Sequence, residues 1–234
     1  MKDERGYQTL EVIAKADKFN QWMFETIRPY CHGNILEIGS GIGNISLLFI
    51  QNGYSITLSD TDEHYIDQLR KNFPGTDIIS IDLVHEHFHE RYGYLFQTFD
   101  TVIFLNVLEH INNEEQAIEN CRRFLKPGGS IVILVPAYSF LFSKMDRELQ
   151  HYRRYTSKRL SELVSKKKFI VRKVFYFNAM GIFAWMYGKF FGLHSIPSKE
   201  MNFFNKLVPL AKFVDRIVLK KTGLSVIMVA QKDL

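Results

Sequence analysis

The chain has 234 residues, 46% of them apolar, so it is long enough to bury a full core, which excludes global disorder. The net charge is +5, and acidic and basic residues are mixed along most of the chain, so no nucleic-acid partner is predicted. Two isolated cysteines exclude a disulfide framework, and the first residues lack an apolar signal core, so we expect a soluble, cytoplasmic protein.

In chain order, a helical segment comes first, and short apolar runs then alternate with helical patterns. Apolar residues at helical spacing predict helix over residues 7–30. Strands are predicted at residues 34–39, 55–60, 77–83, 99–107, 129–136, 169–177 and 224–232. Helices are predicted at residues 43–53, 62–73, 113–125 and 156–167. This alternation predicts an α/β fold with a largely parallel sheet and helices on both faces.

Three glycines, Gly39, Gly41 and Gly43, follow the first predicted strand, and we call them the glycine loop. Asn44 stands where the dinucleotide fingerprint G-x-G-x-x-G has its third glycine, and the P-loop lysine is absent. The loop is therefore expected to turn tightly and let a ligand approach its backbone, without the features that grip phosphate.

Three acidic residues accompany the first three predicted strands. Glu37 precedes the glycine loop and adds negative charge that would attract a cationic cofactor. Asp60 ends the second strand, where an acid can accept hydrogen bonds from ribose hydroxyls. Asp82 ends the third strand, where it can accept a bond from an adenine amino group. Three acids without a paired lysine or arginine predict a nucleoside that carries no phosphates.

The segments ILEIGSGIG, LSD, IDL, FDTVIFLNVLEHI and FLKPGGSIVILVP, in this order, resemble the class I S-adenosylmethionine-dependent methyltransferases. The resemblance covers roughly residues 35–136. It implies S-adenosylmethionine as the cofactor and a Rossmann-like, seven-stranded, mostly parallel sheet. It also implies that the last strand runs antiparallel, as a hairpin with the sixth.

The same resemblance assigns roles at the cofactor site. The glycine loop would pass under the methionine part and the ribose. Asp60 would hold the ribose hydroxyls, and Asp82, with the backbone at Leu83, would bind adenine. Asn106, at the end of the fourth predicted strand, would offer its carbonyl to the methionine ammonium.

A second, weaker resemblance concerns the acceptor. The segments ADKFNQWMFETIRPY and PAYSFLFSKMDRELQHYRRYT are similar to a subset of this superfamily that often accompanies enzymes of glycan or lipid assembly. We therefore expect a small-molecule, sugar or lipid-linked acceptor. Oxygen is the favoured acceptor atom, and nitrogen and carbon stay open.

Two histidines are candidates for the catalytic base. His151 has Asp146 nearby in the sequence, and an acid can orient an imidazole and raise its basicity. His110, four residues after Asn106, is either a base or substrate contact, or a histidine that closes a helix start. A positioned base typically contributes roughly 10²–10⁴-fold to a rate.

Four further residues are candidates for substrate binding. Arg153 and Arg154 could grip a carboxylate or phosphate through paired hydrogen bonds, or form an ordinary exposed charge pair. Tyr138 follows the fifth strand and either lines the pocket or packs inside the core, and Tyr155 adjoins the arginines.

No metal site is predicted. Residues 85–89, HEHFH, satisfy the H-E-x-x-H pattern of zinc proteases. A zinc site of this kind needs both histidines on one helix face together with a third ligand, whereas this segment directly follows the third strand. Trp22 and Tyr7 precede the first strand, and we interpret them as core residues rather than as cofactor contacts.

Residues 178–222 are predicted as a helical cap between the last two strands. The cap and the strand end before it hold many aromatic residues with lysines among them, which suits peripheral membrane contact or a lipid-linked substrate. Packing onto the sheet edge or a dimer contact is the alternative, and the oligomeric state stays open. The chain is thus a single domain, with a helical cover over residues 1–34, a cofactor-binding core over 35–177 and the last strand over 223–234.

Two rival functions stay open. A nicotinamide-dependent oxidoreductase would use a related sheet, but the glycine spacing disfavours it. A catalytically silent, methyltransferase-like partner of a glycosyltransferase would keep the cofactor-binding residues without turnover.

Overall fold

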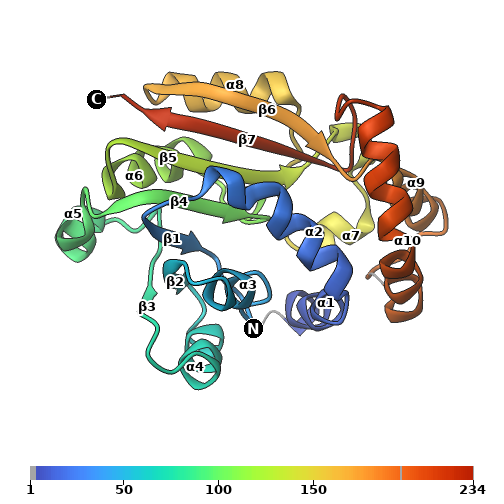
Figure 1. The fold of residues 1–234 in the computed structure, drawn as a ribbon, viewed down its shortest axis with the longest axis horizontal. Helices are drawn as coiled ribbons and strands as arrows, with labels where there is room; N and C mark the ends of the chain where they lie inside the picture. Colours follow the sequence, from blue (N-terminus) through green and yellow to red (C-terminus); the bar gives the residue numbers. More distant parts are fainter. Residues whose placement is uncertain (1–3, 196, 234) are drawn as a thin grey trace.

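The computed structural model describes residues 4–195 and 197–233. In this part of the chain, seven strands form one sheet in the order β3-β2-β1-β4-β5-β7-β6 (Figure 1). The strands are β1 (Asn34–Ile38), β2 (Ser55–Asp60), β3 (Ile78–Ser80), β4 (Phe99–Leu105), β5 (Leu125–Pro136), β6 (Phe169–Phe177) and β7 (Ser225–Lys232). Strand β7 runs antiparallel to both β5 and β6, and the other pairs are parallel. The predicted fold, including its antiparallel last strand, is confirmed.

Helices cover both faces of the sheet. The α-helices are α1 (Glu4–Ala14), α2 (Asp17–Ile27), α3 (Ser46–Gln51), α4 (Glu63–Asn72), α5 (Phe88–Tyr92), α6 (Glu114–Phe124), α7 (Lys144–Glu148), α8 (Ser157–Lys166), α9 (Ala179–Phe190) and α10 (Ser198–Ile217). Short 3-10 helices are η1 (Arg28–Tyr30), η2 (Gly93–Leu95), η3 (Leu108–His110) and η4 (Ser139–Leu141). Helices α5, α6 and α8 pack on one face, and α2, α3 and α10 pack on the other. No helix in the described ranges is both long and apolar enough to cross a membrane.

The two cores follow from the period-2 pattern of the central strands. In β4, Val102 and Phe104 join the core under α5, α6 and α8, whereas Ile103 joins the core under α2, α3 and α10. Successive side chains of a strand point to opposite faces, so a strand that is apolar throughout is buried on both sides. The central strands therefore lie between helices, and their carboxyl ends form one edge of the sheet.

Several element boundaries differ from the sequence prediction. The segment predicted as one helical region over residues 7–30 contains α1, α2 and η1. The predicted strand over residues 77–83 pairs with β2 only over β3, and the backbone N–H of Ile81 makes one further bond to the carbonyl of Asp60 at 3.1 Å. Residues 178–222 hold α9 and α10, as the predicted helical cap requires.

Candidate active site

The glycine loop connects β1 to α3 with all three glycines at positive φ. A Cβ atom on Gly39 would lie 2.5 Å from Cγ2 of Val107, and one on Gly43 would lie 2.4 Å from the ring of Phe73. These distances are far below van der Waals contact, and positive φ disfavours any L side chain. Glycine is therefore required where the chain turns from β1 toward the carboxyl edge of the sheet.

Asp60 fixes the glycine loop from the neighbouring strand. Its carboxylate accepts hydrogen bonds from the backbone N–H groups of Gly41 at 2.9 Å, Thr61 at 2.8 Å and Asp62 at 3.1 Å. Burial raises the pKa of Asp60, and the three hydrogen bonds oppose that rise. Asp60 thus lies beside the loop at the end of β2, where the sequence predicted it, and it shapes the loop directly.

The side chain of Glu37 lies inside the fold and contacts the start of α3. The Glu37 carboxylate is buried and accepts a hydrogen bond from the hydroxyl of Ser46. Burial raises the pKa of Glu37 to about 7, although hydrogen bonds from Ser46 and Ser40 counteract it. At neutral pH its negative charge is therefore only partly developed, which weakens the electrostatic role that the sequence predicted for it.

The remaining cofactor candidates lie at the same edge of the sheet. The carboxylate of Asp82 accepts from the backbone N–H of Val84 at 2.9 Å, and the carbonyl of Leu83 accepts from the amide of Asn120 at 2.8 Å. Asn106 has a φ of 58° and donates its backbone N–H to the carbonyl of a β5 residue at 2.9 Å. The left-handed conformation turns the chain sharply where β4 ends.

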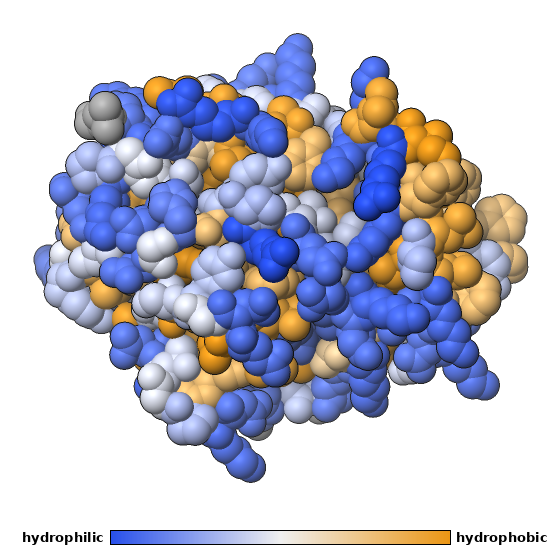
Figure 2. All heavy atoms as spheres, viewed as in Figure 1, coloured by the Kyte–Doolittle hydropathy of each residue, from blue (hydrophilic) through white to orange (hydrophobic). Residues whose placement is uncertain are grey.

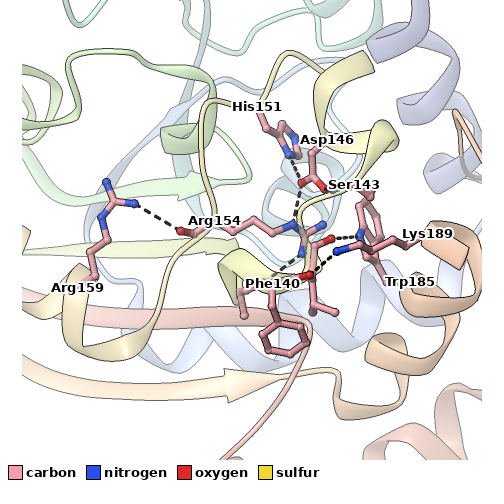
Figure 3. Close-up of polar contacts among 10 residues, drawn as sticks. Phe140, Ser143, Asp146, His151, Arg154, Arg159, Trp185 and Lys189 are labelled. Carbon is pink, nitrogen blue, oxygen red and sulfur yellow. Dashed lines mark hydrogen bonds and ion pairs between the residues drawn. The ribbon is translucent and has the colours of Figure 1, made fainter. Parts of the chain in front are cut away.

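His151 and Asp146 form the pair that the sequence suggested (Figure 3). Nδ1 of His151 lies 2.9 Å from Oδ1 of Asp146, which is completely buried. The other carboxylate oxygen of Asp146 accepts from the backbone N–H and the hydroxyl of Ser143, closing a capping box on α7. Burial opposes ionisation, but the bond from His151 and the charge of Arg154 lower the pKa of Asp146. The acid is therefore ionised and holds the imidazole by its Nδ1 side.

His110 lies beside His151, on η3 immediately after β4. The two ring centroids are 4.6 Å apart in an edge-to-face arrangement. Partial desolvation and then the nearby His151 lower the pKa of His110, although the residue keeps contact with solvent. A cavity of about 330 Å³ opens here, lined by His110, Arg147, Gln150, His151 and Tyr152. The two candidate bases therefore share one cavity.

Glu109 is a site residue that the sequence prediction missed. It is fully buried, and one of its oxygens lies within 4.8 Å of a ring nitrogen of each histidine. Burial raises the pKa of Glu109 to about 7, opposed by the charges of His151 and Arg154. The sequence does place this acid next to His110, shortly after a predicted strand. Acidic residues are mostly exposed, however, so nothing in the sequence indicated that this one is buried.

Arg154, which the sequence predicted as a substrate contact, has its guanidinium engaged inside the fold. Its guanidinium is buried, donates Nε to Asp146 at 2.8 Å and NH1 to the carbonyl of Ala137 at 3.1 Å, and stacks 4.3 Å from the ring of Trp185 (Figure 3). Two hydrogen bonds and one aromatic contact hold the guanidinium in place. Arg154 therefore braces the loop that carries His151, and its charge faces Asp146.

The other three predicted substrate contacts also have internal partners. Arg153 pairs with Glu114 at 3.1 Å and lies over a neighbouring tyrosine ring. Tyr155 is fully buried and donates its hydroxyl to Glu114 at 2.6 Å. Tyr138 stacks on Tyr176 at 5.1 Å, with its hydroxyl 2.9 Å from that of Thr222. Tyr155 and Tyr138 therefore pack within the fold, as the alternative interpretation of Tyr138 had it.

The interpretation of Trp22 as a core residue is confirmed, because it is buried and its ring centroid lies 4.3 Å from that of Phe177.

The histidines of the H-E-x-x-H pattern lie around the start of α5, where the backbone N–H of His87 donates to Nδ1 of His85 at 3.0 Å. Within the described residues, the one group of three metal-capable side chains in close reach is Glu109, His110 and His151.

Residues 36–133 match the family described as "Methyltransferase domain". A protein of Mycolicibacterium smegmatis named "Probable S-adenosylmethionine-dependent methyltransferase" is 25% identical over 190 residues, covering 76% of this chain and 67% of that protein. A lovastatin diketide synthase of Aspergillus terreus is 29% identical over 136 residues, covering 51% of this chain. The chain spans only 5% of the length of that synthase.

Solved structures share the fold at low sequence identity. An S-adenosylmethionine-dependent methyltransferase of Archaeoglobus fulgidus aligns with a TM-score of 0.59 and 17% identity, covering 91% of this chain and 94% of that one. Phosphoethanolamine N-methyltransferase 2 of Haemonchus contortus, in complex with S-adenosyl-L-methionine, aligns with a TM-score of 0.59 and 18% identity, covering 92% and 52%. Residues 36–133 therefore match a methyltransferase domain, and the chain shares the fold of S-adenosylmethionine-dependent methyltransferases.

Proposed function

We propose that the protein transfers a methyl group to an oxygen atom of a sugar, a lipid-linked intermediate or another small acceptor of the kind handled in glycan or lipid assembly. The observation that carries this proposal is the cavity holding His151 and His110 at the carboxyl edge of the sheet. Its wall includes His110 on η3, four residues after Asn106. An acceptor in it would meet a base that a buried carboxylate already orients.

The residues at the carboxyl edge of the sheet fit the cofactor. The three glycines let the loop turn at positive φ beside the end of β2. Asp60, whose carboxylate accepts from the backbone N–H of Gly41, would hold the ribose hydroxyls there. Asp82 and the backbone at Leu83 would hold adenine, and Asn106 would offer its carbonyl to the methionine ammonium. Glu37, which is only partly ionised at neutral pH, would add a weaker attraction for the cationic cofactor. When bound, S-adenosylmethionine supplies a methyl group already activated on a sulfonium.

His151 is the proposed general base. The hydrogen bond from Nδ1 to Asp146 fixes the tautomer and leaves Nε2 to accept a proton from an acceptor hydroxyl. Asp146 stabilises the imidazolium that forms, as a buried carboxylate does in other acid-base pairs. His110, which shares the cavity, is placed to contact the acceptor. Orientation of the acceptor oxygen toward the methyl group supplies the remaining rate acceleration.

The cap supports a lipid-linked acceptor. Apolar side chains gather at the end of the molecule formed by α9 and α10 (Figure 2). The exposed apolar residues of these two helices are Phe183, Met186, Tyr187, Phe190, Phe203, Leu210, Phe213 and Ile217. Exposed lysines, including Lys189, Lys199 and Lys206, lie on the same two helices. We propose that this end contacts the cytoplasmic surface of a membrane.

Calorimetry with S-adenosylmethionine, with its demethylated product and with a nicotinamide dinucleotide tests the cofactor. We expect binding heat with the first two compounds and none with the third.

A screen with labelled S-adenosylmethionine and glycan and lipid extracts then identifies the acceptor. His151→Ala should lower turnover at least about a hundredfold with cofactor affinity kept. Cofactor binding without turnover on any extract would instead indicate a silent binding partner.

A further inference from the structure

We infer that Glu109, His110 and His151 form a binding site for one divalent transition-metal ion at the acceptor end of the domain. One ligand atom from each side chain lies within 4.8 Å of the other two. In a tetrahedral zinc site with bonds of 2.0–2.2 Å, ligand atoms lie roughly 3.3 Å apart. Rotation of the solvent-accessible His110 side chain would close most of the difference.

The strongest single observation is the carboxylate of Glu109. It has no accessible surface, and neither of its oxygens has a hydrogen-bond partner among the described residues. Buried polar groups are nearly always paired, and a buried carboxylate without a partner is costly. Arg154 already binds Asp146, so it leaves the Glu109 carboxylate without a directly bonded cation. A metal ion would supply both the missing charge and the missing bonds.

The histidines are held as metal ligands usually are. Nδ1 of His151 is bonded to the buried Asp146, which leaves Nε2 available and matches the carboxylate–histidine–metal arrangement. The ring of His110 lies edge-to-face against that of His151, with the centroids 4.6 Å apart. The backbone N–H of Tyr152 donates to the carbonyl of Glu109 at 2.9 Å, which joins the loop after β5 to η3. The three ligands therefore come from two loops that are fixed to each other.

The composition of the site points to the class of metal. Two imidazoles and one carboxylate are found in zinc and non-haem iron(II) sites, whereas Mg²⁺ and Ca²⁺ favour sites made of oxygen ligands. Three protein ligands leave a position open, and the adjoining cavity of about 330 Å³ has room for water or an acceptor group there. The arrangement is therefore that of a reactive centre rather than of a closed structural one.

The role of the ion rests on the proposed function. An acceptor hydroxyl bound to the ion would lose its proton to solvent more readily, because a bound cation lowers the pKa of a coordinated oxygen. The resulting oxygen would form a bond to the methyl carbon while the carbon–sulfur bond breaks, leaving a neutral thioether. With the ion present, both nitrogens of His151 are engaged, so its role as base belongs to the metal-free protein.

The test uses untagged protein, stripped with a chelator, dialysed and titrated with Zn²⁺ by calorimetry and with Co²⁺ by visible absorption. We expect one ion per chain and cobalt bands typical of four- or five-coordination. Glu109→Gln, His110→Ala and His151→Ala should each weaken binding by about tenfold or more. His85→Ala, in the H-E-x-x-H segment, is the matched control and should leave the affinity unchanged.

Circular dichroism melts confirm that each variant is folded, and the near-isosteric Glu109→Gln keeps the test valid if a histidine variant unfolds. Equal metal affinity in wild type and Glu109→Gln, or no metal binding by the stripped wild-type protein, would overturn the site.

Titration of S-adenosylmethionine into the stripped protein separates the two proposals. Cofactor binding without metal binding defeats only the metal site, whereas metal binding without cofactor binding defeats the proposed function.

Discussion

At the scale of single residues, two buried glutamates differ in their hydrogen-bond partners. Glu37 accepts a hydrogen bond from Ser46, whereas the carboxylate of Glu109 has no bonded partner among the described residues. Burial raises the pKa of both to about 7. Glu37 is therefore a satisfied part of the fold, while Glu109 retains an unmet need for a cation or a proton.

The raised pKa of Glu37 predicts a pH dependence of stability. The folded pKa of about 7 lies above the usual 4.5, so between these values the folded protein holds a proton that the unfolded chain has released. Stability from this residue is therefore full below about pH 4.5 and is lost as pH rises through 7. Glu37→Gln should lack this pH dependence. The difference in free energy of unfolding between wild type and the variant should therefore change by about 1–3 kcal/mol between about pH 5 and pH 8.

Urea unfolding of wild type and Glu37→Gln at about pH 5 and pH 8 measures this difference. The comparison cancels the contribution of Glu109, which is present in both proteins. Parallel pH profiles for the two proteins would show that Glu37 is ionised in the folded state across this range.

At the scale of elements, the helical insertion braces the candidate site. Trp185 on α9 donates its indole N–H to the carbonyl of Leu141 at 3.0 Å, and its ring lies 4.3 Å from the guanidinium of Arg154. Arg154 in turn bonds Asp146, the partner of His151. An element that the sequence places far from the sheet core thus determines the position of the candidate base (Figure 3).

We therefore expect Trp185→Ala to destabilise the protein by about 1–3 kcal/mol and to lower turnover, because Arg154 loses its cover and Asp146 becomes accessible to water. Trp185→Phe should recover most of the stability, since it keeps an aromatic face over the guanidinium. Phe183→Ala, on the same helix but 75% exposed, is the control and should change stability little. Equal losses for Trp185→Ala and Phe183→Ala would contradict a specific bracing role.

At the scale of the whole molecule, the two ends of the sheet differ in surface character. The end formed by α9 and α10 exposes Phe183 and Phe190, the latter to 83%, whereas the far end around α5 carries charged residues and one exposed aromatic, Tyr94 (Figures 1 and 2). Clustered exposed apolar side chains mark interaction surfaces, whereas scattered ones do not. The molecule therefore has one end suited to a non-aqueous partner.

Cosedimentation with vesicles tests this asymmetry. Wild type should bind vesicles that contain an anionic phospholipid, more weakly in high salt, and bind neutral vesicles poorly. A variant with Phe183→Ser and Phe190→Ser should lose at least about tenfold in affinity, and Tyr94→Ser is the matched control. If the double variant binds vesicles normally but loses a dimer seen by light scattering, the surface is an interface between copies of the chain.

Local sequence patterns were enough to predict the order of the strands and helices, the glycine loop and the acids at the strand ends. Each of these depends on local properties: side-chain period, backbone freedom at glycine, and the place of a residue at the end of its own strand. The positions of Gly39, Asp60 and Asn106 at one edge follow once the strands are parallel.

The folded structure was needed to show which charged side chains are exposed and which are buried. Neighbours in the sequence, Arg153 and Arg154, differ because α9 covers one of them, and Glu109 meets His151 because the loop after β5 folds back onto η3. Such contacts join segments far apart in the chain, and their burial depends on packing that no local pattern encodes. The role of a charged residue is therefore set by what covers it, which only the folded chain specifies.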